Sequence, residues 1–387
     1  MSRVIDVVRQ YGHITQVELT AATGLSQASI SNIVKALVAE GVFQTENTIR
    51  SGRRARQVSL RRPAGLLAGI SIGRRMMRVA VSDLNLETRA EKSLPLPVNH
   101  RPDTTLDRAA LLVVELLEGI GASPDELVSA GVVLPAPINR TTGLISLEGM
   151  MPGWEDIETA VVLGRRLGRP VGIDNDANAA AVAEARLGEL RSVENGLFVR
   201  ASYNTGAGVI LGGHIHRGAR GTVGEIGHVQ VESTGLICAC GARGCLNTVV
   251  GADIIVESLR LTRGYSSLSD VIREANEGDR GCRQVIGDAG GQIGAVLADF
   301  STTFAPTKIV VGGELSTTGD LLLEPIRDAL ASRPLLADSV EVVQASLGPK
   351  AELTGALVLA LEEAELMDAG SPAVGDVAAA GQEVVVG

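Results

Sequence analysis

A cluster of one histidine and three cysteines constrains the fold of this sequence more than any other feature. Four candidate metal ligands fall within eighteen residues, and two glycines lie between the last two cysteines. Three thiolates and one imidazole complete a tetrahedral zinc shell, and ligand distances of about 2.0–2.3 Å require a tightly turned chain, which glycine permits. The prediction is a structural zinc ion bound by His228, Cys238, Cys240 and Cys245.

The alternative is a set of buried thiols beside a core histidine, but four candidate ligands so close in sequence favour metal. In a reducing compartment the same clustering favours metal over disulfides. Cys282 stands apart from the cluster. We expect it to be a small buried apolar side chain.

Charge is distributed unevenly along the 387 residues. Residues 1–62 hold nine basic and four acidic side chains, whereas the remainder holds 26 basic and 41 acidic ones. A basic module on an acidic body suits local contact with nucleic acid. No run reaches the roughly 18 apolar residues of a membrane span, and the first ten residues carry three charges instead of signal-peptide features. We therefore expect a cytoplasmic protein of two or three domains, without a membrane partner.

The basic segment has the pattern of two helices joined by a glycine turn. Ser26 suits an N-cap after the turn at Gly24, because its hydroxyl can accept from free backbone N–H groups. Ile30, Val34 and Leu37 predict a second helix over about 27–40 with its apolar face inward. The opposite face is short and polar, which suits the major groove of DNA.

An arginine-rich segment follows between two apolar runs, 42–43 and 58–60. Two short strands there would place the arginines at a hairpin tip that reaches phosphates or the minor groove. The alternative is a helical subdomain with solvated arginines, but helix spacing, turn and basic hairpin agree on a winged helix-turn-helix over 1–62. The predicted DNA contacts are Ser26, Gln27, Ala28, Ser31, Asn32, Lys35, Arg53, Arg54 and Arg56.

From residue 63 to 368 the sequence alternates short β-rich runs with helical ones. This alternation predicts an α/β body with mostly buried sheets. The segment 369–387 is rich in Ala, Gly and Val without periodicity, and we expect a flexible tail. Strands are expected at 66–72, 77–83, 130–134, 171–174, 197–201, 209–211 and 309–311, and helices at 106–119, 160–167, 177–187, 295–304 and 353–366.

Asp174, Asn175 and Asp176 lie where a predicted strand ends and a helix begins. Ligands of α/β folds bind at such strand ends, and these side chains can bracket vicinal hydroxyls, with Asp176 placed to accept a proton. Helix capping by Asp or Asn explains the same cluster equally well. Glu225 lies three residues before His228, so a metal at His228 would fix this carboxylate near the ligand site.

Together the segments 174–184, 221–228 and 238–246 resemble the ROK family of repressors, open reading frames and sugar kinases, including repressors of the xylose, N-acetylglucosamine or glucose type. The match spans nearly the whole chain, because ROK repressors carry a winged helix before an actin-like, sugar-kinase body. The resemblance implies two lobes around a cleft, a zinc loop over 228–245, and Asp176 at the kinase base position. One nitrogen of His228 would face zinc and the other the sugar. The implied sugar contacts are Asn175, Asp176, Glu225 and His228.

On the nucleotide side the sequence departs from the family's kinases. Those enzymes begin their body with an Asp-x-Gly-Gly-Thr turn, whereas this chain has Ser71 and, three residues on, Arg74 followed by a second arginine. Long side chains there oppose the close approach of backbone to phosphates. The second phosphate loop begins with Asn204 instead of glycine, while Gly312 and Gly313 on the adenosine side are kept. Phosphoryl transfer from ATP is therefore not expected.

Asn247 marks a further departure, because hexose-binding family members place Glu two residues after the last cysteine. An amide both donates and accepts, so we expect a sugar that differs at one hydroxyl or carries an amine or acyl group. Asn247 joins the predicted sugar contacts.

These observations predict a sugar-responsive transcriptional regulator, a repressor of carbohydrate metabolism rather than an enzyme. It would bind a palindromic operator as a homodimer or homotetramer, because one winged helix reads too few base pairs. A sugar or amino sugar in the cleft would change DNA affinity. The alternative is an active ATP-dependent, glucokinase-like kinase with a DNA-binding domain, supported by Asp176 and Gly312. An activator or a sugar-independent regulator stays open as a third possibility.

Overall fold

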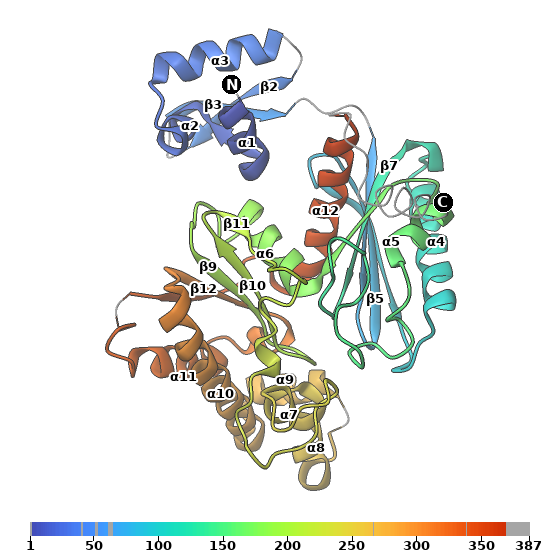
Figure 1. Ribbon diagram of the computed structural model, residues 1–387, viewed down its shortest axis with the longest axis vertical. Coiled ribbons are helices and arrows are strands. Elements are labelled where there is room, and N and C mark those ends of the chain that lie inside the picture. The colour runs from blue at the N-terminus through green and yellow to red at the C-terminus, as the bar shows by residue number, and fades with distance from the viewer. Residues whose placement is uncertain are drawn as a thin grey trace, which may run out of the picture. The chain divides into compact units, whose positions relative to one another are not determined.

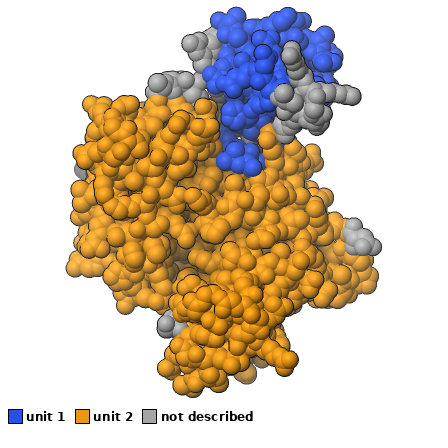
Figure 2. All heavy atoms as spheres, turned by 180° about the vertical axis from the view of Figure 1, so that it is seen from behind, with its two compact units in different colours: residues 1–64, 185–187 blue, residues 65–184, 188–387 orange. Residues whose placement is uncertain are grey.

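The computed structural model describes residues 2–39, 42–50, 53–60, 65–265, 267–337 and 339–368. The chain forms two compact units, residues 1–64 with 185–187 and residues 65–184 with 188–387, which have different colours in Figure 2. The predicted tail at 369–387 and the predicted domain boundary at 62 lie outside the described residues. Among the described helices, none is long and apolar enough to cross a membrane.

The N-terminal unit consists of helices packed on a small antiparallel sheet (Figure 1). In chain order its elements are α1 (Ser2–Tyr11), β1 (His13–Thr15), α2 (Gln16–Thr23), α3 (Gln27–Ala39), β2 (Phe43–Arg50) and β3 (Arg53–Leu60), with strand order β1-β3-β2. Ile30, Val34 and Leu37 are buried in its core, as predicted for the second helix of the motif.

Side-chain and glycine caps define the two helices of the motif. Thr15 and Glu18 form a reciprocal capping box at the start of α2, and Gly24 ends that helix with φ 69°. The Ser26 hydroxyl accepts from Ser29 N at 3.1 Å, which confirms Ser26 as the N-cap of α3.

The wing is longer than the sequence predicted. β2 and β3 run for eight residues each, pairing Arg50 with Arg53 and Asn47 with Arg56 in the backbone register. The arginine-rich segment therefore belongs to two strands, because antiparallel pairing extends almost to the turn. The predicted contacts made by the side chains of Arg53 and Arg54 lie outside the described residues. α1 was not predicted.

The second unit begins with a lobe built on a five-stranded sheet of order β6-β5-β4-β7-β8. Its elements are β4 (Leu66–Ile72), β5 (Met76–Asp83), β6 (Thr88–Pro95), α4 (Pro102–Gly119), β7 (Leu127–Leu134), α5 (Thr159–Leu167), β8 (Val171–Asn175) and the late helix α12 (Ala351–Asp368). α4 covers one face of the sheet and α12 the other (Figure 1). α12 packs closely because β7 carries Gly131, where a Cβ would lie 2.1 Å from Ala356 O.

The second lobe has a sheet of order β11-β10-β9-β12-β13. It comprises β9 (Gly196–Arg200), β10 (Gly206–Leu211), β11 (His214–Ile215), α7 (Asn247–Val250), α8 (Ala252–Arg263), α9 (Leu268–Glu277), α10 (Arg280–Phe304), β12 (Lys308–Gly312), α11 (Asp320–Ala331) and β13 (Glu341–Gln344). α6 (Asp176–Leu187) links the sheets in sequence. The predicted α/β body of two lobes is confirmed. α10 begins well before its predicted start, because its internal glycines interrupt the apolar pattern.

Candidate functional site

The four predicted metal ligands converge. His228 ends the short 3-10 helix η2 (Ile226–His228), and the cysteines follow in the next loop. Their ligand atoms all lie within 4.8 Å of one another. His228 Nδ1 is 3.4 Å from Cys238 Sγ, and Cys240 Sγ is 3.8 Å from Cys245 Sγ. The edge of a tetrahedral site with Zn–S bonds of about 2.3 Å measures about 3.8 Å, so this donor set fits zinc.

Backbone pairing and a glycine fold the metal loop. Gln230 pairs with Cys245, and Ile237 pairs with Arg243. Gly244 has φ 66°, and a Cβ there would lie 1.6 Å from the carbonyl oxygen at 232. Only glycine allows this turn, which brings the last cysteine back to the others.

The second ring nitrogen of His228 points to a carboxylate. His228 Nε2 is 3.8 Å from Glu225 Oε2, and within the described part of the chain it is buried without a hydrogen-bond partner. Burial lowers the pKa of His228, whereas burial and the nearby charge of Asp176 raise the pKa of Glu225 to about 7. A buried unpartnered nitrogen beside a carboxylate is a place where a ligand hydroxyl can bind.

The end of β8 and the start of α6 hold the predicted acidic cluster. Asn175 is the N-cap of α6, since its Oδ1 accepts from two backbone N–H groups of the first turn, and its Nδ2 donates to Ala136 O at 3.2 Å. Arg217 Nε and Nη2 lie 2.8 and 2.6 Å from Asp174 Oδ2. Capping is therefore confirmed for Asn175, and its contact with a sugar stays a prediction.

Asp176 takes part in a charged network between the lobes. Arg200 Nε, at the end of β9, lies 3.4 Å from Asp176 Oδ2 and 2.7 Å from Glu352 Oε1 at the start of α12. The three side chains are only 9–14% exposed. Burial raises the pKa of Asp176 to about 6, although the charge of Arg200 opposes the rise.

Asn247 lies at the start of α7 and faces the glycine-rich loop before β10. Its Oδ1 accepts from Thr205 N at 2.7 Å, and a Cβ on Gly227 would lie 2.3 Å from its Nδ2. Asn247 thus ties the segment after the last cysteine to the loop before β10. Its predicted contact with a sugar stays a prediction.

A polar pocket adjoins the charged network, on the side that the family resemblance assigns to the nucleotide. Four arginines and two glutamates line it, drawn from the turn between β4 and β5, β5 itself, the end of β9, the 3-10 helix η3 (Glu314–Thr318) and α12. Arg75 Nη2 is 2.9 Å from Asp253 Oδ1, and its guanidinium lies 5.5 Å from the centroid of the Tyr203 ring. The Arg75 side chain therefore links the turn after β4 to α8 and to Tyr203.

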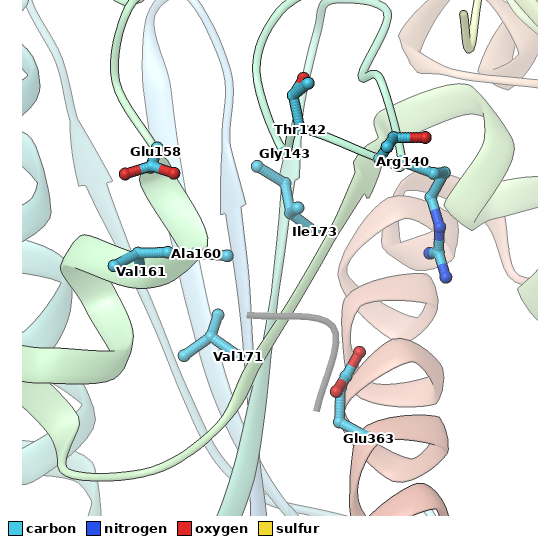
Figure 3. Close-up of a pocket in the computed structure, with 10 residues that line it drawn as sticks. Arg140, Thr142, Gly143, Glu158, Ala160, Val161, Val171, Ile173 and Glu363 are labelled. Atoms are coloured by element: carbon cyan, nitrogen blue, oxygen red, sulfur yellow. The ribbon is translucent and has the colours of Figure 1, made fainter. Parts of the chain in front are cut away.

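A separate pocket opens on the first lobe (Figure 3). The turn at 140–143, α5, β8 and Glu363 of α12 line it, with apolar walls that include Val161, Val171 and Ile173. No residue predicted to bind sugar or metal belongs to this lining.

On the N-terminal unit, the predicted DNA-reading face of α3 is open to solvent. Ser31 is half-buried, and Ser26, although exposed, uses its hydroxyl in the helix cap. The exposed predicted contacts are Gln27, Ala28, Asn32 and Lys35 on α3 and Arg56 on β3.

Comparison with known families decides the identity of the body. The model described as "ROK family" matches residues 67–363, and that described as "Winged helix-turn-helix DNA-binding" matches residues 2–44. The chain belongs to the ROK family. The predicted fold, a winged helix before an actin-like α/β body, is confirmed.

Several regulators align with this ROK protein over nearly their full length. The DNA-binding transcriptional dual regulator NagC of Escherichia coli (strain K12) is 29% identical, covering 92% of this chain and 90% of its own. The xylose repressor of Bacillus subtilis (strain 168) is 27% identical, covering 88% and 89%. The structure of a ROK family transcriptional regulator homologous to E. coli MLC covers 97% of this chain and 98% of its own, with TM-score 0.73 and 25% identity.

A ROK family glucokinase from Streptomyces griseus, solved with glucose and AMPPNP, matches a smaller part of the chain. It covers 77% of this ROK protein and 100% of its own chain, with TM-score 0.69 and 25% identity. Regulators thus share the DNA-binding unit and the body. The predicted class, a DNA-binding transcriptional regulator, is confirmed over the kinase alternative.

Sequence reasoning missed three charged residues of this ROK site. Arg200 and Glu352 are 152 positions apart, and Arg217 and Asp174 are 43 apart. The partners lie on different strands, helices or loops, so no local sequence pattern predicts that they contact one another. A single arginine at the end of an otherwise apolar strand was the one available signal for Arg200.

Proposed function

We propose that this ROK protein is a sugar-responsive transcriptional repressor without kinase activity. The observation that carries the proposal is the position of Arg200 between two carboxylates, with its Nε 3.4 Å from Asp176 Oδ2 and 2.7 Å from Glu352 Oε1. The ion pair with the guanidinium restrains the position of this carboxylate, so in this proposal Asp176 binds a sugar hydroxyl without removing its proton. Arg74 and Arg75 at the first phosphate turn point the same way.

The sugar would bind beside the end of β8. Asp176, Glu225 and His228 Nε2 would accept or donate hydrogen bonds to neighbouring hydroxyls, and the free N–H groups of Asn175 and Asn247 would complete the shell. Such a polar site selects ligands strongly, because a sugar lacking one hydroxyl leaves a buried group unpaired.

Zinc on His228, Cys238, Cys240 and Cys245 would have a structural role. When bound, the ion supplies a rigid anchor for the loop and keeps the cysteines as thiolates. With Nδ1 of His228 directed to the metal, Nε2 carries the proton and can donate to a sugar oxygen. The metal loop and the sugar site would thereby share one residue.

The winged helix would read operator DNA. α3 would lie in the major groove through Gln27, Ser31 and Asn32, while Lys35 and Arg56 would contact phosphates. Two copies, in a homodimer or homotetramer, would bind the halves of a palindrome. Sugar binding would alter DNA affinity only if the two states differ in sugar affinity.

Calorimetry with hexoses, pentoses, hexosamines and their acetylated forms, followed by operator gel shifts with each binder, tests the proposal. We expect at least one sugar to bind wild type, fail to bind Asp176→Asn and change the gel shift. The proposal is wrong if no sugar changes DNA binding. A coupled assay with Mg-ATP covers the kinase alternative, which robust turnover dependent on Asp176 would restore.

A further inference from the structure

The pocket of the first lobe lies at the outer edge of β8, the last strand of its sheet. The strand order of that sheet ends at β8, so within the described chain no strand pairs with this edge. Figure 3 shows the pocket with α5 on one side and α12 on the other, and with Val171 and Ile173 of β8 between them. We call it the β8-edge pocket.

The backbone of β8 has free hydrogen-bonding groups at this edge. Ala130 N donates to Pro170 O at 2.9 Å, which fixes the register of the parallel pair β7–β8. Successive residues of a strand direct their backbone groups to opposite sides, so Val171 and Ile173 direct N–H and C=O away from β7. Among the described residues these groups have no hydrogen-bond partner. Such an edge is a template for a further strand.

The opposite edge of the same sheet is protected in a way that β8 is not. β6 carries Arg89, Glu91 and Lys92, and it ends at Pro95. Charged side chains and proline are the usual means by which an edge strand avoids pairing with another chain segment. By contrast, residues 171–173 of β8 are apolar and buried. We therefore expect a further segment to cover the edge of β8.

The side chains of the pocket define the chemistry of that segment. Its walls are largely apolar, and α5 and α12 flank β8 on its two faces. Arg140 is half-buried, and in the described part of the chain its guanidinium has neither an ion pair nor a hydrogen bond. Of the two glutamates, Glu158 is exposed and Glu363 already takes part in another interaction. A run of β-branched residues with one carboxylate matches this lining.

The sequence after α12 contains such a run. Glu383 is followed directly by three valines, residues 384–386. α12 contributes Glu363 to the pocket and ends at Asp368, which is about 7.5 Å further along the helix. Residues 369–382 can span up to about 46 Å when extended, so they are long enough to return Glu383 to the pocket.

We propose that the β8-edge pocket is the docking site of a strand supplied by this chain, Glu383–Val386. The segment adds to the free edge of β8 through backbone hydrogen bonds to Val171 and Ile173. Its valines pack between α5 and α12, and the carboxylate of Glu383 pairs with Arg140. This docking site does not depend on the regulatory function proposed above.

Hydrogen exchange of the full chain, resolved to single amides, tests the backbone contacts. The test variant combines Val384→Asn with Val386→Asn, which removes apolar side chains from the docked segment. We expect the amides of Val171 and Ile173 to exchange about tenfold faster in this variant, because each loses a hydrogen-bond acceptor.

The amides of Gly172 and Asp174, which face β7, serve as internal references and should not change. Val374→Asn combined with Val377→Asn is the matched control, since it removes two valines of the same tail outside the segment. Equal exchange at Val171 in wild type and in the test variant overturns the proposal. Protection that depends on protein concentration but not on the valines also overturns it, in favour of a second copy paired at this edge.

A charge exchange tests the side-chain contact. Arg140→Glu and Glu383→Arg should each accelerate exchange at Val171 and Ile173 several-fold, because each opposes like charges. The double variant restores an ion pair with reversed polarity and should return exchange to near the wild-type rate. Asp376→Arg combined with Arg140→Glu should give no such rescue. If the Glu383→Arg double variant is not rescued either, Glu383 does not pair with Arg140 and the proposed docking is wrong.

Discussion

The two sides of the interlobe cleft use the same kind of scaffold with opposite chemistry. On the side proposed for the sugar, the end of β8 and the segment before the metal loop bring together Asp176, Glu225 and His228, which are acceptors or neutral donors. On the nucleotide side, the turn after β4 and the end of β9 present Arg74 and Arg200. The side chains of both sides stand at the ends of strands, so the fold alone does not distinguish the two sides.

The difference teaches that the proposed loss of phosphoryl transfer would need no change of fold. Kinase and regulator bodies superpose over the whole glucokinase chain. Under the proposal, the side chains at one strand end and one turn decide the function, rather than the architecture.

The largest effect is expected on the sugar side, from Cys240→Ser. Removal of one thiolate from a four-ligand site should lower zinc affinity by more than about 100-fold, because even residues around the ligands contribute 10–100-fold. The metal loop should lose its fixed geometry, and with it sugar affinity. Metal content by mass spectrometry and calorimetry with a bound sugar measure both effects.

Cys282→Ser is the matched control, because Cys282 is a buried thiol of α10 outside the cluster. It should keep its full metal content. Full metal content in Cys240→Ser would mean that the predicted ligand set is wrong. The metal would then have no assigned role in holding the sugar site.

The next largest effect is expected where the two sides meet, from Arg200→Met. This change leaves Asp176, Glu352 and the nearby Glu314 without their shared cation. Removing one partner of a buried ion pair costs about 3–5 kcal/mol of unfolding free energy. Urea unfolding measures the change, and Arg333→Met, which breaks an exposed pair with Asp299, should have little effect.

If Arg200→Met instead leaves stability unchanged, the pair with Asp176 does not restrain the kinase base. A gain of ATP-dependent turnover in that variant would contradict the proposal that the protein lacks the residues for phosphoryl transfer. It would show that one arginine separates the two chemistries.

The sequence predicted the parts of the site that are local. The metal ligands span 228–245, the cap of α3 and its core positions repeat with helical spacing, and Asn175 stands at a strand end. Their chemistry is visible because neighbours in sequence are neighbours in space. Local sequence pattern could not decide whether Asn175 caps a helix or binds a ligand, because both roles suit an Asn at a strand end.

The missed parts are long-range. Arg200 meets Glu352 only because α12 returns from the end of the chain to cover the first sheet. The wing was predicted too short for a related reason, since register between β2 and β3 extends into polar residues that show no apolar alternation. Contacts between elements distant in sequence, rather than local sequence preference, determined both the Arg200–Glu352 pair and the length of the wing.

The third effect is a pH dependence from Asp176. Its pKa is raised from 3.8 to about 6 by burial. Between these values the folded state holds a proton that the unfolded state has released, so stability falls as pH rises from about 4 to 6, by up to about 3 kcal/mol. Asp176→Asn never ionises. It should equal wild type at pH 4 and exceed its stability at pH 7, measured by urea unfolding at both pH values.

If Asp176→Asn is more stable than wild type and no longer binds sugar, the carboxylate of Asp176 is needed for function although it lowers the stability of the fold. If the variant is less stable than wild type at pH 7, the attraction of Arg200 outweighs burial. Asp176 would then belong to the structural network more than to the sugar side.

The smallest effect concerns Asn247, which ties the two sides together through Thr205 N at 2.7 Å. Asn247→Ala removes that acceptor and should lower the unfolding free energy by about 1 kcal/mol. Asn247→Asp keeps the acceptor but replaces the amide donor with a charged carboxylate oxygen, so the contact with Thr205 N should persist while sugar affinity changes several-fold. Calorimetry with one bound sugar across both variants separates the two roles. If Asn247→Asp leaves sugar affinity unaltered, Asn247 has only a structural role between the two loops. It would then not belong to the proposed sugar contacts.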